Sequence, residues 1–361
     1  NADDEEKGYI YIADGDFTIT SDGDGMDASS IVQIEDGTFD ITAGGGAANS
    51  QKTHESDMPG GGMSQNIERP DGKSMPQMGE KPDEESMSQM GEKPDEESMP
   101  QMGEKPDGEN MPQDTTTDES STSTKGIKAG GGMYLNGGTY QIDSADDSIH
   151  SNANITIADG TYTLATGDDG VHADDALTVN GGTITVTESY EGLEGLTVTI
   201  NDGTIDITAS DDGINTAGEK MELNGGYIHI LAGGDGLDSN GDLTINGGEI
   251  YIDGPSDNGN SAIDYGDRSS AYVNGGTLVA IGSSGMAEVM SDSSKQKVLM
   301  VKLGEQMEAG DVVLTDSEGN VIVSYTALKT YDCVIISTAE VESGATYTLT
   351  TSGTMTEVTA E

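Results

Sequence analysis

The sequence predicts an all-β protein whose largest part is a parallel β-helix with about 22 residues in each coil. An acidic motif, clearest as Asp-Asp-Gly-Val-His-Ala at 168–173, recurs along the chain, and its second acidic position falls at residues 147, 169, 191, 212 and 235. A second marker keeps the same interval, because turn glycines stand at residues 138, 160, 182, 203, 226 and 248. Short segments between the markers alternate apolar with polar residues, as a strand with one buried face does. Two independent markers with one period indicate a single structural unit that is repeated and stacked.

Two copies of the unit already occupy residues 8–49. Ile10-Tyr11-Ile12 and Phe17-Thr18-Ile19 are expected strands, with Asp14-Gly15 as the turn between them. An acidic segment follows, and a second copy begins at Val32. The helix is therefore expected from residue 8 onwards.

The pattern stops between residues 50 and 125. A different repeat of 12 residues begins there at Ser74, Ser86 and Ser98, rich in Pro, Glu, Ser and Met. This composition cannot bury enough apolar surface to offset the entropy of ordering, so 50–125 is predicted to be a disordered insertion. Its Met-x-x-Met pairs offer soft ligands for Cu(I), but a flexible tether is the favoured interpretation.

The regular array continues over residues 126–285. Aligned copies give columns of like residues, and one inward column consists of Ile10, Val32, Met133, Ile155, Leu177, Val198, Met221, Leu243 and Ala271. Asparagines form a column before the glycine turns, at Asn136, Asn180, Asn201, Asn224, Asn246 and Asn274. A structural role is expected for them, since asparagine tolerates turn geometry and can hydrogen-bond along a stack. Like residues lie above like residues only when successive coils are parallel, which favours a β-helix over an up-and-down barrel.

The period is lost in residues 286–361, where a small β-rich C-terminal domain is expected. Short strands are predicted at 297–303, 312–314, 321–325, 333–337 and 346–350. An open end of a β-helix would be a template for aggregation, so this domain is expected to cover it.

Composition limits the partners. The chain has 67 Asp and Glu against 15 Lys and Arg, a net charge of -52. Such a chain repels nucleic acid and anionic membrane surfaces, and it attracts cations. No run of about 18 apolar residues occurs, so no membrane insertion is expected. Cys333 is the only cysteine, which excludes a disulfide within this sequence.

Stacking places the recurrent acids in lines that a divalent cation can neutralise. Coils about 4.8 Å apart put one file of carboxylates at Asp147, Asp169, Glu191, Asp212 and Asp235. Asp146, Asp168 and Asp211 lie beside this file, and Asp238 follows Asp235 by three residues. Neighbouring charges would repel by about 3–4 kcal/mol at an effective dielectric constant of 20. Ca²⁺ takes six to eight oxygen ligands, so these nine residues are candidate calcium ligands, and Mg²⁺ is less suited because it retains its water.

Two other interpretations of these turns remain open. The acids can instead form a solvated surface with diffuse counterions. His150 and His172 stand in a second column, three residues after the acids, and stacked histidines can bind zinc. However, no cysteine or third histidine lies near them in the sequence, so a polar pair is favoured.

Four features of the sequence occur together: the Gly-Gly-Thr turns, the Asp-Asp-Gly-(Ile/Val)-(His/Asn) motifs, the stretch Glu-Ser-Tyr-Glu-Gly-Leu-Glu-Gly at 188–195 and the C-terminal Gly-Ala-Thr-Tyr-Thr-Leu at 344–349. In these features the chain resembles the clostridial carbohydrate-binding β-helix family. The likeness covers 8–49 and 126–352. The resemblance implies a right-handed parallel β-helix, secreted or on the cell surface, that holds calcium and binds plant cell-wall polysaccharides. It also implies a likeness in fold to polysaccharide lyases.

By the same resemblance, the matching acids would be the calcium ligands, above all Asp146, Asp147, Asp168, Asp169, Glu191, Asp211 and Asp212. The chain departs from the pattern at Lys125 and Lys128, which replace acids, so no ion is expected in that coil.

Two functions compete on this basis. A non-catalytic module would bind pectic or cellulosic polysaccharide, with Ca²⁺ bridging to uronate groups where the sugar is acidic. A calcium-dependent lyase would instead need a base that removes a sugar proton, and Lys220 is the candidate nearest the acid file. Binding without cleavage is favoured because basic residues are few in the helix and Lys220 is expected to be an exposed charge. A structural cell-surface stalk is a third interpretation.

Overall fold

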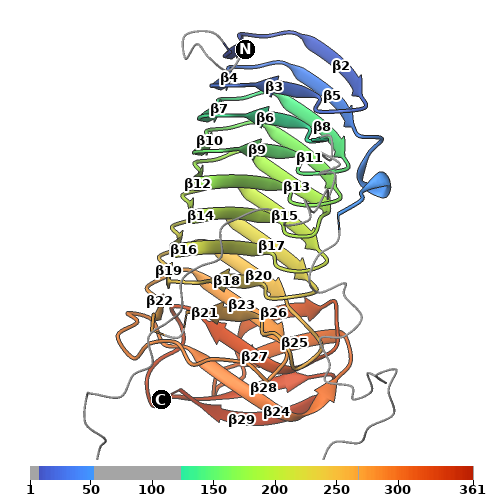
Figure 1. Cartoon of the computed structure of the whole chain (residues 1–361). Coiled ribbons are helices and arrows are strands. Elements are labelled where there is room, and N and C mark those ends of the chain that lie inside the picture. The colour runs from blue at the N-terminus through green and yellow to red at the C-terminus, as the bar shows by residue number, and fades with distance from the viewer. Residues whose placement is uncertain (1–7, 53–122, 267, 361) are drawn as a thin grey trace, which may run out of the picture. The chain divides into compact units, whose positions relative to one another are not determined.

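The computed structural model describes residues 8–52, 123–266 and 268–360. It is all-β apart from one short 3₁₀ turn, η1 (Ala47–Asn49). The strands form a β-solenoid of about eight turns with roughly 22 residues per turn (Figure 1). The fold predicted from the two periodic markers is therefore confirmed. Most of the insertion expected at 50–125 lies outside the described residues.

The coils contribute strands to three faces, and successive coils pair in parallel on each face. The first face consists of β1 (Ile10–Ile12), β4 (Val32–Ile34), β7 (Met133–Leu135), β10 (Ile155–Ile157), the second halves of β12 (Val171–Val179), β14 (Leu193–Ile200) and β16 (Ile214–Leu223), then β19 (Asp242–Ile245) and β22 (Ala271–Val273). The second face consists of β2 (Asp16–Ser21), β5 (Thr38–Ala43), β8 (Thr139–Ser144), β11 (Thr161–Thr166), β13 (Thr183–Glu188), β15 (Thr204–Ala209), β17 (Tyr227–Ala232), β20 (Glu249–Asp253) and β23 (Thr277–Gly282). The third face consists of β3 (Met26–Ala28), β6 (Ile127–Ala129), β9 (Ile149–Ser151), the first halves of β12, β14 and β16, then β18 (Leu237–Ser239) and β21 (Ile263–Tyr265).

The register is continuous across the sequence gap. β4 pairs with β7, β5 with β8, and β3 with β6, each without a slip. The insertion therefore leaves the chain between β5 and β6, in the turn that joins the second face to the third. This is also the turn that carries the acidic motif in the other coils.

The core is built from the predicted columns. Ile155, Leu177 and Val179 are fully buried, and residues of the same columns are paired in register with one another. On the second face the aromatic rings of four successive coils stack with centroids 5.0, 4.7 and 4.6 Å apart: Phe17, Phe39, Tyr140 and Tyr162. The coils thus bury a continuous apolar interior that no single coil could form.

The turn between the first and second faces depends on glycine and asparagine. Gly182 has φ +90°, and a Cβ atom there would lie 2.8 Å from the carbonyl oxygen of Gly160 in the coil before it. Asn201 donates to Asn180 at 2.8 Å, and Asn224, Asn246 and Asn274 continue this ladder at 2.8–2.9 Å. The structural role predicted for the asparagine column is confirmed.

The C-terminal part covers one edge of the solenoid. β27 (Tyr331–Ser337) pairs antiparallel with β23, and β24 (Leu299–Met307) extends the same sheet beyond it. β26 (Val321–Ala327), β25 (Gly310–Thr315), β28 (Thr346–Thr351) and β29 (Thr354–Thr359) form a separate four-stranded sheet. Val279 and Ile281 of the solenoid share an apolar cluster with Val312 and Leu314 of this sheet. The five expected strands are present with shifted ends, and β29 is additional.

Candidate metal centre

The acidic turns between the second and third faces stack in register. Each backbone N–H after the recurrent acid binds the carbonyl of the acid in the next coil, as Gly170 does to Glu191 at 3.0 Å. We call the resulting line of carboxylates the acid column: Asp147, Asp169, Glu191, Asp212 and Asp235. The residues three positions later pair in register across the third face and form a flanking column: His150, His172, Glu194, Asn215, Asp238 and Asp264.

The four aspartates of the acid column are buried, and Glu191 is partly buried. Asp147 is fully buried, and Asp169, Asp212 and Asp235 are 6–8% exposed. One oxygen of each is held by a backbone N–H of the next coil, for example Asp212 Oδ1 by the amide of Asp235 at 2.7 Å. The burial of these four carboxylates favours a specific partner over the alternative of a solvated surface with diffuse counterions.

Two lysines neutralise the N-terminal part of the column, where Asp146, Asp147 and Asp168 converge. We call these three the lysine-paired group. The Lys125 ammonium lies 2.9 Å from Asp146 Oδ1 and contacts Asp147, and Lys52 lies 2.6 Å from Asp168 Oδ2 and 3.1 Å from Asp146 Oδ1. Burial opposes the charge of Asp147, but its hydrogen bond to His150 and the nearby Lys125 outweigh burial and lower its pKa. Burial raises the pKa of Asp168 to about 7, with Asp169 and Asp147 adding to it.

Sequence reasoning missed both contacts. Lys125 was expected only to exclude an ion from its own coil, whereas its side chain reaches the acids of the coil after it. Lys52 follows the last N-terminal coil and carries no motif, so nothing in the sequence signalled that it would lie beside Asp146 and Asp168. Only the direct pairing of the coils on either side of the insertion brings it there.

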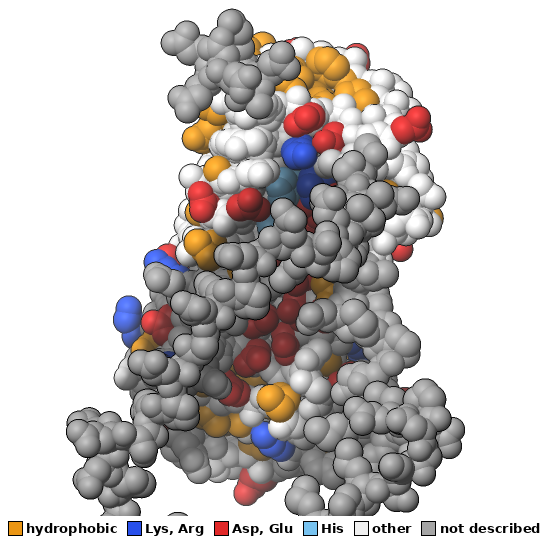
Figure 2. All heavy atoms as spheres, viewed as in Figure 1, with side chains coloured by type: hydrophobic (Ala, Val, Ile, Leu, Met, Phe, Trp, Pro, Cys, Tyr) orange, Lys and Arg blue, Asp and Glu red, His pale blue; other side chains and the backbone are white. Residues whose placement is uncertain are grey.

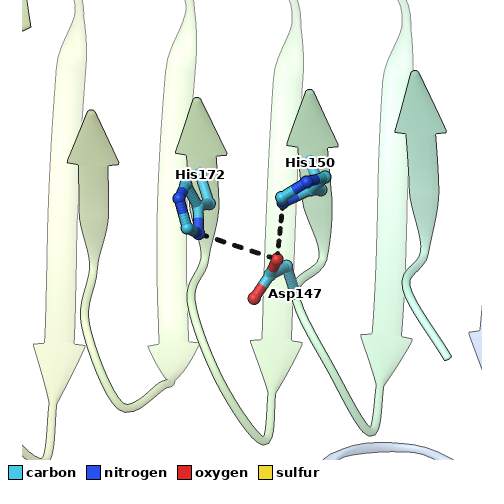
Figure 3. Close-up of side chains that lie close together, drawn as sticks. All are labelled: Asp147, His150 and His172. Carbon is cyan, nitrogen blue, oxygen red and sulfur yellow. Dashed lines mark ion pairs between the residues drawn. The ribbon is translucent and has the colours of Figure 1, made fainter. Parts of the chain in front are cut away.

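Two histidines flank the column in the coils of Asp147 and Asp169. His150 and His172 come from adjacent strands of the third face and point toward Asp147 (Figure 3). His150 Nδ1 lies 2.8 Å from Asp147 Oδ2, and His172 Nδ1 lies 3.2 Å from both Asp169 Oδ2 and Glu194 Oε2. Burial opposes protonation of His172, but its hydrogen bond to Asp169 and the charge of Glu194 raise its pKa to about 9. The ring is therefore a cation at neutral pH and serves this part of the column as a counterion.

The C-terminal part of the column has no such cation. Asp212, Asp235 and Asp238 place ligand atoms within 4.8 Å of one another, and we call them the three-carboxylate group. Within the described ranges, no Lys, Arg or His forms an ion pair with any of the three. Figure 2 agrees, because Lys and His side chains stand among the acids near the N-terminal end of this face, whereas a band of acids follows farther down.

Because the three-carboxylate group has no counterion among the described residues, the pKa values of its three aspartates are raised. Burial, with the charges of Asp211 and Asp235, raises the pKa of Asp212 to about 8. Burial, with the charge of Asp264, raises the pKa of Asp235 to about 7 and that of Asp238 to about 6. Without a cation, Asp212 and Asp235 therefore retain protons closer to neutral pH than an ordinary aspartate does.

Three neighbours complete the surroundings of this group. Burial and the charges of Asp169 and Glu194 raise the pKa of Glu191 to about 9, and Asn215 Nδ2 donates to Glu191 at 3.0 Å. Asn215 Oδ1 is buried and has no hydrogen-bond partner. A Cβ atom added at Gly234 would lie only 2.4 Å from the Oδ1 atoms of Asp211 and Asp212, so a side chain at this position would collide with them. The site thus offers several oxygen acceptors, and the lack of a side chain at Gly234 leaves space for the carboxylates of Asp211 and Asp212.

The structure therefore divides the nine predicted ligands among different surroundings. Asp146, Asp147 and Asp168 meet two lysines, Asp169 meets His172, and Asp212, Asp235 and Asp238 meet one another, with Glu191 and Asp211 beside them. These acidic and histidine groups could hold a metal ion. Lys220 lies apart from them, because its residue pairs with Asp242 on the first face and its half-exposed ammonium binds Glu222 at 2.8 Å.

Comparison with known proteins identifies the family. No curated protein and no solved structure gives a significant match to the chain. No helix among the described residues is both long and apolar enough to cross a membrane. A family model described as carbohydrate-binding domain-containing protein matches residues 1–170 and 168–318, which is most of the sequence. The chain belongs to this family of carbohydrate-binding domain-containing proteins, in agreement with the resemblance and with the β-solenoid.

Proposed function

We propose that the protein is a calcium-dependent, non-catalytic module that binds plant cell-wall polysaccharide outside the cell. We place a Ca²⁺ ion at the three-carboxylate group. The observation that carries this assignment is that the buried carboxylates of Asp212 and Asp235 converge with the partly buried carboxylate of Asp238, with no cation of the described chain among them. Buried charges of one sign are tolerated only when a partner neutralises them.

The donor set suits calcium better than other metals. Every candidate ligand is an oxygen, from the three carboxylates and from the unpartnered Asn215 Oδ1. Ca²⁺ takes six to eight oxygen ligands in flexible geometry, whereas Zn²⁺ prefers nitrogen and sulfur. Coils about 4.8 Å apart allow carboxylates of two coils to bind one ion. The N-terminal part of the column does not need such an ion, because Lys52, Lys125 and His172 already neutralise it.

The polysaccharide partner follows from the family, and the choice between binding and cleavage follows from the scarcity of bases. A lyase needs a neutral base close to its metal. Lys220 is paired with Glu222, and Lys125 is fixed by two aspartates with its pKa raised, against burial, by Asp147 and Asp146. Lys125 is therefore held in its protonated form, and Lys220 lies on the first face, away from the acid column. An extracellular location fits the proposal, since sites of moderate affinity fill where calcium is abundant.

The ion is tested by thermal unfolding with Ca²⁺ and with excess EDTA. Calcium is expected to raise Tm in the unmodified protein and to have little effect in Asp212→Asn combined with Asp238→Asn. Asp175→Asn is the matched control, because Asp175 is an exposed carboxylate outside the column. An unchanged Tm in EDTA would contradict the calcium assignment.

Polysaccharide binding is tested by co-sedimentation with cellulose and by affinity electrophoresis in polygalacturonate. The protein is expected to bind at least one of them and to release no unsaturated product absorbing in the ultraviolet. A steady rise in this absorbance that is absent from Lys220→Ala would show a lyase instead. Binding to neither polymer would leave the structural stalk as the better account.

A further inference from the structure

A row of aromatic rings lies on the outer surface of the second face near its C-terminal end. The rings of Tyr227 and Tyr251 have centroids 5.7 Å apart, and Tyr251 stacks on Tyr325 at 5.2 Å with an interplanar angle of 13°. Tyr227 and Tyr251 belong to adjacent solenoid strands, β17 and β20, whereas Tyr325 belongs to β26 of the C-terminal sheet. The row therefore joins two parts of the protein that are far apart in the sequence.

Hydrogen bonds hold the inner end of this row in place. The Tyr325 hydroxyl donates to Asp253 Oδ2, and the backbone amide of Leu328 donates to Asp253 Oδ1 at 2.8 Å. Asp253 is 1% exposed, so this anchor is shielded from water. Tyr251 and Tyr325 also pack against the apolar cluster of the C-terminal sheet. The outer ring, Tyr227, is 42% exposed and presents its surface to solvent.

A shallow groove of about 570 Å³ crosses four coils, and Tyr227 lines it in the second of them. Its floor is formed by the turn glycines Gly203, Gly226, Gly248 and Gly276, and its polar lining by Asp202, Thr204, Glu249 and Thr277. The floor lacks side chains, so a ligand can approach the backbone closely. Four strands spaced about 4.8 Å apart give the groove a length of about 14 Å along the solenoid axis.

These groups match the surface of a neutral sugar chain. An exposed tyrosine offers an apolar face for the C–H groups of a pyranose ring and a hydroxyl for hydrogen bonding. Carboxylates accept hydrogen bonds from vicinal sugar hydroxyls, and threonine hydroxyls both donate to them and accept from them. The charged side chains of the lining, Asp202 and Glu249, are both acidic, so a polyuronate would be repelled there.

Single exposed tyrosines are common on protein surfaces and carry no such implication. Tyr11 and Tyr134 on the first face are of that kind, since Gln33 separates them in the strand register. Tyr227 differs because its ring adjoins a second ring and borders a groove.

We propose that the groove bordered by Tyr227 and lined by Thr204, Glu249 and Thr277 binds a neutral polysaccharide chain along the solenoid axis, separately from the acid column. The inference rests on the proposed polysaccharide-binding function and assigns the surface that performs it for uncharged sugars. Tyr227 stacks on a pyranose ring, and the carboxylate of Glu249 accepts from its hydroxyls.

The test compares Tyr227→Ala with Tyr134→Ala, because both tyrosines are 42% exposed on the same solenoid. Binding of the calcium-loaded full chain to hydroxyethyl cellulose and to polygalacturonate is measured by affinity electrophoresis. Tyr227→Ala is expected to weaken binding to hydroxyethyl cellulose about three- to tenfold and to leave its Tm unchanged. Tyr227→Phe is expected to retain most of the binding, and Tyr134→Ala all of it.

The outcomes separate this inference from the proposed function. Unaltered binding of Tyr227→Ala to the neutral polymer overturns the inference, and so does equal loss in Tyr134→Ala. If the unmodified protein binds only polygalacturonate, the assignment of the groove to a neutral polysaccharide is overturned, and the proposed function stands. Binding to neither polymer overturns both.

Discussion

Lys125 occupies a position in the stack where other coils have a carboxylate, and its ammonium neutralises the acids of the following coil. Its side chain is 12% exposed, and its partner Asp147 is fully buried. The pair is thus a buried ion pair, whose disruption leaves an uncompensated charge. At this end of the acid column the neutralising positive charge comes from Lys125. At the other end we propose that it comes from Ca²⁺.

Replacement of Lys125 by methionine is expected to destabilise the protein strongly. Removing one partner of a buried pair costs about 3–5 kcal/mol, and Ca²⁺ should recover part of this loss by entering the vacated position. Urea unfolding with and without Ca²⁺ measures both effects. Lys220→Met is the control, because its half-exposed pair with Glu222 should contribute at most about 1 kcal/mol. Equal losses in the two variants would contradict the role given to Lys125.

A single glycine shapes the proposed calcium site. A Cβ atom at Gly234 would lie 2.4 Å from the Oδ1 atoms of Asp211 and Asp212, so Gly234→Ala must displace both carboxylates. The variant is expected to lose most of the calcium-dependent rise in Tm, because the ligands move. Differential scanning calorimetry in Ca²⁺ and in EDTA checks this, and a full calcium response in the variant would contradict it.

At the scale of the element, the stacked acidic turns make stability depend on pH. Burial and neighbouring acids raise the folded-state pKa of Asp212 to about 8, of Asp235 to about 7 and of Asp238 to about 6, all above the ordinary aspartate value. The folded state therefore binds more protons than the unfolded state in this range, and stability falls as pH rises. A bound cation removes this cost by favouring the ionised form.

Calcium-free protein is accordingly expected to unfold at a lower temperature at pH 8 than at pH 5. The stabilisation by retained protons is fully present below the unfolded pKa near 4 and is lost as pH rises through about 6 to 8. With Ca²⁺ present, the fall should be reduced or absent. Thermal scans at several pH values in EDTA and in Ca²⁺ provide the measurement. A calcium-free Tm that rises from pH 5 to pH 8 would show that these carboxylates are not protonated as described.

The strands and turns of the solenoid were predictable from the sequence because each coil repeats the same local pattern. The columns that contain Ile155 and Asn201 follow from spacing alone, because in-register stacking brings residues that are one period apart in the sequence into contact. The vertical alignment of Asp147 with Asp169 follows in the same way. Burial of these carboxylates was not predictable, because it depends on how closely the flanking column packs beside them.

At the scale of the whole molecule, the contacts that escaped prediction join segments that no period relates. Lys52 reaches Asp146 and Asp168 across the insertion, and Tyr325 of the C-terminal sheet stacks on Tyr251 of the solenoid. Such contacts depend on three-dimensional packing, of which a single sequence carries no local sign. The C-terminal strands were located only approximately for the same reason, and β29 was missed.

The C-terminal sheets are expected to keep the solenoid from self-association. β27 pairs antiparallel with β23, and Val279 and Ile281 of β23 pack into the apolar cluster beneath these sheets. A chain ending at residue 285 would expose an unpaired strand edge and these apolar side chains, which together template edge-to-edge pairing. Size-exclusion chromatography with light scattering should therefore show higher oligomers or precipitation. A chain with 53–122 replaced by a short Gly/Ser linker is the control and should elute unchanged, because β4, β5 and β3 pair directly with β7, β8 and β6 across that gap. If the chain ending at 285 stays in the same oligomeric state as the full protein, the edge is protected by the solenoid itself and the C-terminal sheets have another role.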